Sequence, residues 1–225
     1  MEQNNVAFSQ KNQIFTICHR IDLIEATHGA KRNELTQERS TDMYGMVNQA
    51  VRGLVVDKFG AEVWAKIHER AGAPENFSAM QPYDDSITYG LVEKAVEVLG
   101  IPADVILRTF GEYWVNEIAK KHYEKLLSNT GRDFADFLGN LDHMHQRIRV
   151  TFPDYQPPSF RVKQLEEGTL QVDYYSHRPG LLPFVEGLFT GLGSHFSVSV
   201  SFEHIPDEAH PLPSKRMIVR YASIP

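Results

Sequence analysis

The chain has 225 residues, 42% of them hydrophobic, and its formal net charge at pH 7 is -6. Because no run of Lys or Arg accompanies this acidic balance, nucleic acid and anionic membranes are not expected as partners. The single cysteine, Cys18, excludes an intramolecular disulfide, and His19, Arg20 and Asp22 interrupt the nearby apolar residues before a signal peptide or spanning helix could form. We therefore expect a globular, cytoplasmic protein.

Residues 1–42 are polar, mixed in charge and without clear periodicity, which predicts a poorly ordered N-terminal extension. Two interpretations stay open. Met43 could be the true initiator, so that the first 42 residues are an artefact of the assigned start site, or the segment is a short regulatory arm. The folded domain is expected to span residues 43–225.

Apolar residues at helical spacing follow from Met43 and predict a series of helices. The first ends at Gly60, and the others are expected over residues 61–72, 84–100, with an Asp cap, and 102–123. A further helix is predicted over residues 131–150. On one face of it lie Phe134, Leu138, Leu141, His145 and Ile148.

Beyond residue 158 the period shifts toward two and predicts four strands, over residues 160–166, 169–177, 197–205 and 216–223. A helix over residues 181–196 lies between the second and third strands, with Pro183 in its first turn and glycines suited to close packing. The expected fold class is α+β. An N-terminal helical subdomain precedes a four-stranded antiparallel sheet with helices.

His145 occupies a position on an apolar helix face where Leu or Phe would be expected. One interpretation is a buried core histidine bonded to a backbone carbonyl. The other is a metal ligand, since neutral imidazole binds both iron and zinc. Zinc normally needs three or four ligands, and residues 43–225 contain no cysteine. A lone histidine suits haem, whose porphyrin already supplies four nitrogens.

Tyr174, Ser176 and Arg178 alternate along the second predicted strand and therefore share a face with Leu170 and Val172. Two hydroxyl donors and a guanidinium on one face would suit paired carboxylates such as the haem propionates. Each hydrogen bond to a charged group contributes about 1.5–3 kcal/mol. The alternative is a polar strand face exposed to solvent.

These residues fall within motifs that resemble the H-NOX family, the haem nitric oxide/oxygen binding domains that include the sensor domain of soluble guanylate cyclase and stand-alone bacterial proteins. The resemblance covers residues 43–225. It rests on "MYGMVNQAV", "DDSITYGLV", "FGEYW", "FLGNLDHMH", "PPSF" and "YYSHR". The last of these matches the family's Y-x-S-x-R signature.

The resemblance implies a non-covalent haem b between the two subdomains. His145 is then the proximal iron ligand, Tyr174, Ser176 and Arg178 bind the propionates, and Pro158 presses on the porphyrin. The remaining pocket residues that it implies are Val47, Val51, Trp114, Phe184 and Leu188.

The resemblance also bears on the gas that is bound. Family members that bind O2 stably have a tyrosine where this chain has Phe184, which has no donor, so we expect a sensor selective for NO, with CO as a further diatomic ligand. Trp114 and Tyr113 are the nearby side chains whose N–H or O–H could replace that donor.

The resemblance further implies a switch and not catalysis, with the following steps and effector. NO binding weakens the bond to His145, the helix over residues 132–150 is freed, and the porphyrin relaxes away from Pro158. The expected effector is a separate histidine kinase or a diguanylate cyclase/phosphodiesterase. Two alternatives stay open: a haem-free α+β module that binds another carboxylate, and a haem-dependent enzyme, for which no distal acid or base is evident.

Overall fold

The computed structural model of the chain describes residues 42–153, 155–206 and 214–224. The poorly ordered extension predicted for residues 1–42 lies outside them except for Asp42. Four helices form the first half: α2 (Gly45–Phe59), α3 (Ala61–Ala71), α4 (Asp85–Leu99) and α5 (Ala103–Tyr113). Asp84 caps α4 by accepting a hydrogen bond from the backbone N–H of Ser86, as predicted.

A short two-stranded sheet precedes these helices and was not predicted. β1 (Asp42–Tyr44) pairs antiparallel with β2 (Pro82–Asp84). Met43, taken from the sequence as the start of the first helix, therefore lies in a strand. The pairing holds the start of the described domain beside the start of α4.

The helix predicted over residues 102–123 is continuous in the structure but changes its winding. α5 runs into a π-helical segment, η1 (Trp114–Ala119), which is followed by α6 (Lys120–His122) and, after Tyr123, by α7 (Glu124–Ser128). π segments are rare and are often found at functional sites. Here the segment begins at Trp114.

The helix predicted over residues 131–150 is two helices, so the prediction of a single helix was wrong. α8 (Phe134–Gly139) and α9 (Leu141–Thr151) are separated at Asn140, whose ψ of 5° departs from helical geometry. Gly139 and Asn140 both have low helix propensity, and this explains why the break falls there. Apolar spacing alone did not reveal it, because it continues across the break.

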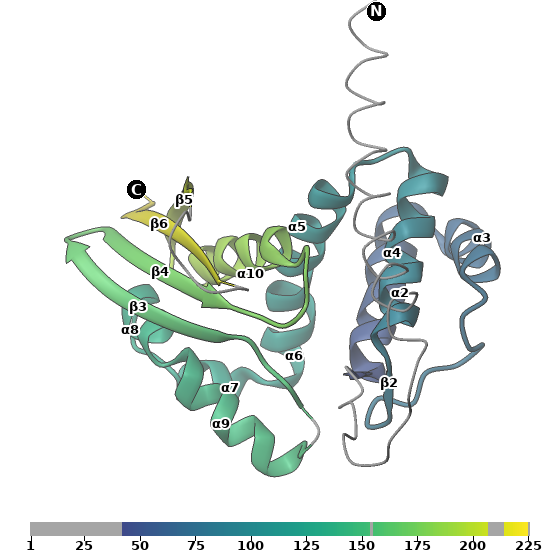
Figure 1. Ribbon diagram of the computed structural model, residues 1–225, viewed down its shortest axis with the longest axis horizontal. Helices are drawn as coiled ribbons and strands as arrows, with labels where there is room; N and C mark the ends of the chain where they lie inside the picture. Colours follow the sequence, from purple (N-terminus) through teal and green to yellow (C-terminus); the bar gives the residue numbers. More distant parts are fainter. Residues whose placement is uncertain (1–41, 154, 207–213, 225) are drawn as a thin grey trace, which may run out of the picture. The chain divides into compact units, whose positions relative to one another are not determined.

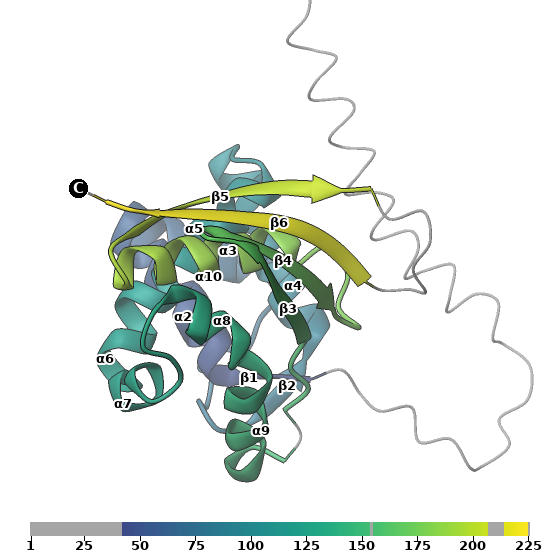
Figure 2. The ribbon, with the colours of Figure 1, turned by 90° about the vertical axis from the view of Figure 1, so that its left-hand side faces the viewer.

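The second half is a four-stranded sheet with strands in the predicted places. These are β3 (Ser159–Glu166), β4 (Thr169–Tyr175), β5 (Val198–Ile205) and β6 (Ser214–Ser223), all antiparallel in the order β3-β4-β6-β5. α10 (Leu182–His195) covers one face, as Figures 1 and 2 show. Leu170, Val172, Met217 and Val219 pack beneath it with Phe189, all at most 1% exposed.

α5 and α10 cross at close range. A Cβ atom added to Gly187 would collide with the backbone carbonyl of Arg108, and one added to Gly111 would collide with that of Phe184. The close-packing role predicted for the glycines of α10 is confirmed at Gly187. Among the described residues, no helix has the length and apolar character needed to cross a bilayer.

Candidate functional site

His145 lies on the inner face of α9 and is 9% exposed. Its Nδ1 atom is 3.2 Å from the carbonyl oxygen of Pro158. Because a carbonyl only accepts, this contact places the ring proton on Nδ1 and leaves the lone pair on Nε2. Burial lowers the pKa of His145, and nearby Asp142 opposes the shift only in part. The side chain is thus a neutral imidazole with one nitrogen available to a metal.

Two aromatic rings flank this imidazole. The ring centroids of Tyr155 and Phe160 lie 6.0 and 6.1 Å from that of His145. Phe160, on β3, in turn packs against Tyr174 at 5.5 Å. Burial raises the pKa of Tyr155 to about 12, so its phenol stays protonated at neutral pH. Sequence reasoning did not find Tyr155, which lies in an irregular segment without a pattern.

Asp142 joins α9 to the start of β3. Its carboxylate accepts hydrogen bonds from the hydroxyl of Ser159 at 2.7 Å and from the backbone N–H of Phe160 at 2.9 Å. These bonds fix the segment that contains Pro158, and therefore the carbonyl that holds His145. Asp142 is a second site residue that was not predicted from the sequence. The available signal was its position three residues before His145, which places the two side chains on neighbouring parts of the helix surface.

Tyr174 and the two other predicted donors do not share a strand. Tyr174 lies within β4, on the inner face of the sheet, and is 4% exposed. β4 ends at Tyr175, so Ser176 and Arg178 lie beyond the strand. The Ser176 hydroxyl accepts a hydrogen bond from the backbone N–H of Arg178. This local bond forms a turn that alternation along a strand could not reveal. The prediction of a common strand face was wrong, yet the three residues stay adjacent.

Arg178 already has three protein partners. Its Nε donates to Asp85 on α4 at 2.7 Å, Nη1 to the carbonyl of Gln156 at 2.7 Å and Nη2 to the carbonyl of Asp42 at 2.9 Å. A guanidinium has five N–H donors, so two are left for another anion as far as the described residues show. Asp85 was not predicted as a site residue. Arg178 therefore connects the helical half to the segment before β3.

A second group of predicted residues gathers where α2, α5 and α10 meet. Val47 and Val51, one turn apart on α2, belong to the same apolar cluster as Trp114 and Phe184. Leu188 lies one turn after Phe184 on α10 and packs with Trp114 against the core of the sheet. The structure thus brings the five predicted pocket residues into adjoining clusters.

Phe110 completes this group and was missed from the sequence. Its ring stacks on that of Phe184 with 5.1 Å between centroids, and Trp114 meets it edge-on at 6.2 Å. Tyr113 packs against the same cluster, but its hydroxyl is directed to the carboxylate of Asp57, to which it donates at 2.7 Å. The wall formed by these rings is apolar apart from the indole N–H of Trp114.

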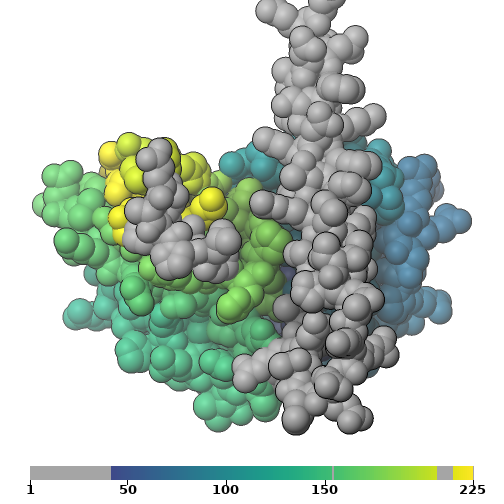
Figure 3. Space-filling view, in the orientation of Figure 1, coloured from purple at the N-terminus to yellow at the C-terminus, as the bar shows by residue number. Residues whose placement is uncertain are grey.

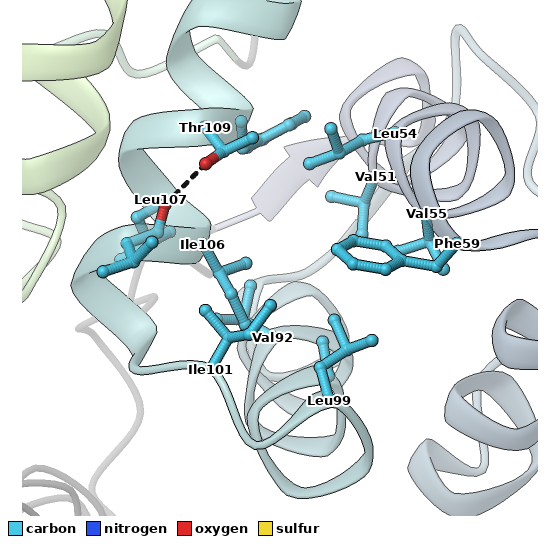
Figure 4. A pocket seen from close by; sticks show the side chains of 13 residues that line it. Val51, Leu54, Val55, Phe59, Val92, Leu99, Ile101, Ile106, Leu107 and Thr109 are labelled. Atoms are coloured by element: carbon cyan, nitrogen blue, oxygen red, sulfur yellow. Dashed lines mark hydrogen bonds between the residues drawn. The ribbon is translucent and has the colours of Figure 1, made fainter.

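A small, partly open apolar cavity of about 60 Å³ lies behind this wall, between α2, α4 and α5. Figure 4 shows the side chains that surround it, among them Val51, Leu54 and Ile106, pointing toward one another. Pockets that hold small-molecule ligands usually measure about 300–1,000 Å³. The cavity shares Val51 and Phe110 with the aromatic wall but contains no proximal residue, so it is distinct from the site around His145.

The donor set fits haem. A neutral imidazole suits a single axial iron ligand, since no described residue occupies its Nε2. The N–H groups of Arg178 that no described residue accepts from, with the phenol of Tyr174, suit propionates, and the apolar wall suits a porphyrin face. The arrangement is compatible with a haem-binding domain of the α+β class.

Comparison with known proteins gives the family. The model of the haem-NO-binding (HNOB) family matches residues 44–204. The chain therefore belongs to this family, known as H-NOX.

Among curated proteins, the chain is 27% identical over 180 residues to soluble guanylate cyclase gcy-31 of Caenorhabditis elegans. The matched region covers 79% of this chain and 26% of that protein. With gcy-34 of the same organism it shares 32% identity over 151 residues, or 65% of this chain and 22% of that protein. The chain thus spans about a quarter of the length of these relatives.

Solved structures support the fold. An unliganded Fe(II) H-NOX protein from K. algicida superposes with a TM-score of 0.71 at 23% identity, covering 81% of this chain and 98% of that one. An H-NOX protein from S. oneidensis in the Fe(II)NO state gives 0.70 at 21% identity, covering 80% and 100%. The predicted fold class and family are confirmed.

Proposed function

We propose that this chain is a haem-based sensor of NO and not an enzyme, with His145 as the proximal iron ligand. The observation that carries the proposal is the state of this side chain. It is neutral and buried, its Nδ1 is held by the carbonyl of Pro158, and its Nε2 has no hydrogen-bond partner among the described residues. A hydrogen bond on the other ring nitrogen is the usual device that orients a ligating histidine.

Arg178 and Tyr174 would hold the haem propionates, with Ser176 shaping the turn that presents Arg178. The two N–H groups of Arg178 that lack a partner among the described residues support this role. Ser176 contributes indirectly, because its hydroxyl is engaged with the backbone of Arg178. Pro158 would contact the porphyrin on the side of His145.

Phe184, Val47, Val51, Trp114 and Leu188 would face the bound gas. Their apolar character favours NO, which binds ferrous haem without a hydrogen bond, over O2, whose complex is stabilised by a donor. Tyr113 does not compete for this role, since its hydroxyl is bound to Asp57.

His145 connects gas binding to α9. Nε2 of His145 would hold the haem iron, and the haem would supply the gas-binding metal. If gas binding released that nitrogen, α9 would still be held by its packing, by the contact of Nδ1 with the carbonyl of Pro158 and by the bonds of Asp142 to Ser159 and Phe160. The segment that contains α9 lies on the molecular surface, at the lower edge of Figure 3, with His143, Arg147 and Val150 exposed. A separate histidine kinase or a diguanylate cyclase/phosphodiesterase is the proposed effector that reads this change.

The test is an absorption spectrum of the ferrous protein, purified with haem available and recorded with and without NO. A Soret band that shifts on addition of NO is expected, together with no stable O2 complex in air. Absence of any Soret band would contradict the proposal and favour a haem-free ligand-binding module. His145→Gly should lose haem unless imidazole is supplied, and unaltered haem binding would mean that another residue ligates the iron.

A further inference from the structure

A buried carboxylate lies on α10 between two side chains of the proposed gas pocket. Glu186 is 3% exposed, and Phe184 and Leu188 each stand two residues away from it. Residues two apart on a helix point to nearly opposite sides, so Glu186 faces away from the pocket. A buried charge is costly unless it is paired, and the proposed sensing chemistry makes no use of this one.

Glu186 is paired on both oxygens. Oε2 accepts a hydrogen bond from Nε of Arg108 on α5 at 2.7 Å, and Oε1 lies 2.6 Å from Nε2 of His204 on β5. Arg108 also donates to Asp104, one turn earlier on α5, at 2.7 Å. We call Glu186, Arg108, His204 and Asp104 the Glu186 network. It joins a helix of the first half to a strand of the sheet through α10.

The network lies beside a close contact between the backbones of α5 and α10. Gly187, next to Glu186, meets the backbone of Arg108, and Gly111 meets the backbone of Phe184. Glycines allow two backbones to approach, but without side chains they offer little resistance to sliding along the helix axes. A charged pair with defined donor and acceptor atoms does resist it.

The same sliding would disturb the pocket. Phe110 follows Arg108 by two residues on α5, and Phe184 precedes Glu186 by two residues on α10. The stack of these rings, with 5.1 Å between centroids and 27° between planes, therefore depends on the relative position that Arg108 and Glu186 fix. Ion pair and aromatic stack are two connections across one helix crossing.

We infer that Glu186 is a positioning residue for the gas site: through Arg108 and His204 it holds Phe184 against Phe110 and so sets the shape of the pocket and the rate of gas exchange. The part of the inference that concerns gas exchange rests on the proposed function, because it needs a gas bound at haem. The proposed effect of the network on the position of the rings does not depend on which gas is bound.

Glu186→Ala removes both connections, whereas Glu186→Gln keeps an oxygen that can accept from Arg108. The matched control is Glu203→Gln, which breaks the exposed pair with Arg220 on the sheet. Each protein is loaded with haem and reduced under CO, and the C–O stretching band and the CO dissociation rate are measured. Near-ultraviolet circular dichroism of the haem-free proteins reports on the packing of the rings.

In Glu186→Ala the C–O band should shift or broaden, and the dissociation rate should change by about 2- to 30-fold, the range for substitutions remote from a ligand. The circular dichroism of the haem-free form should change as well. Glu186→Gln should lie between this variant and the unchanged protein, and Glu203→Gln should match the unchanged protein. Should Glu186→Ala not fold, Arg108→Gln breaks the same contact from a half-exposed side chain.

An unchanged C–O band and dissociation rate in Glu186→Ala or Arg108→Gln, with only the unfolding temperature lowered, would overturn the inference and leave Glu186 a purely structural residue. If the unchanged protein binds no haem, the proposed function fails instead. The circular dichroism comparison then decides whether Glu186 positions the rings.

Discussion

The Nε atom of Arg178 lies 2.7 Å from Oδ2 of Asp85, and the two side chains are only 13% and 9% exposed. The same guanidinium donates to the carbonyl oxygens of Asp42 and Gln156. One cation therefore fixes three segments that are distant in the sequence, namely β1, the start of α4 and the segment before β3. It is also the cation that we propose for haem propionate.

Asp85→Asn should destabilise the haem-free protein by about 1–3 kcal/mol, because Arg178 loses a charged partner in a largely buried place. The loss should be smaller in the haem-loaded protein, where a propionate supplies negative charge. Urea unfolding of both forms measures the difference. The control is Glu97→Gln, which breaks the exposed pair with Lys94 and should cost less than about 0.5 kcal/mol. An equal loss in both forms would contradict a propionate beside Arg178.

Arg178→Gln should weaken haem binding by about 10- to 100-fold, the equivalent of one lost hydrogen bond between charged groups. Haem dimethyl ester, whose propionates are neutral, should bind the variant and the unchanged protein alike. Transfer of haem to apomyoglobin measures both affinities. His177→Gln is the matched control, since His177 is exposed in the same turn. Equal weakening with the ester would show that Arg178 acts only on the fold.

Phe184→Tyr should add a hydrogen-bond donor to the apolar wall and slow the dissociation of O2 by about 2- to 10-fold, in line with a net gain of about 0.5–1.5 kcal/mol for one hydrogen bond. Phe184→Leu, which removes the ring without adding a donor, serves as control. Stopped-flow mixing of the ferrous proteins with O2 gives the rates. If both variants behave alike, the side chain at this position does not reach the gas.

The haem-free protein should lose stability below pH about 6.5 through His145. Burial lowers the pKa of His145 in the folded state, so the unfolded chain takes up its proton first as the pH falls. The contribution of neutral His145 to the stability of the folded state is complete above the pKa of His145 in the unfolded chain. It is lost as the pH falls through the pKa of His145 in the folded state. Urea midpoints at about pH 7.5 and about pH 5.5 should therefore differ more in the unchanged protein than in His145→Gln. An equal pH dependence would mean that other groups account for it.

Sequence patterns predicted most of the regular secondary structure of this fold. Strands at period two and capped helices appear at their expected places because burial of Leu170, Val172 and similar residues decides them locally. The break at Asn140 was missed because the apolar spacing continues across it. The pairing of β1 with β2 was missed because it joins segments forty residues apart with no shared pattern.

The candidate site divides in the same way between residues with a local sequence signal and residues that matter only through contacts in the folded chain. His145 was predicted because a polar side chain interrupts an apolar helix face, and Phe184 because the family resemblance implied it. Asp85 and Tyr155 could not be found, since their importance lies in contacts with Arg178 and His145 that only the folded chain creates. Phe110 had no signal of its own, being one apolar residue among many on α5.

Under the proposed mechanism, the break between α8 and α9 would limit how much of the protein has to move if His145 were released. Phe134, Phe137 and Leu138 anchor α8 in the core at 1% exposure each, whereas α9 buries only Leu141 and His145. Were the two helices one rigid rod, displacing His145 would pull three phenylalanine and leucine side chains out of the sheet core. With Asn140 between them, the proposed displacement of His145 would need to move the eleven residues of α9 and not the core side chains of α8.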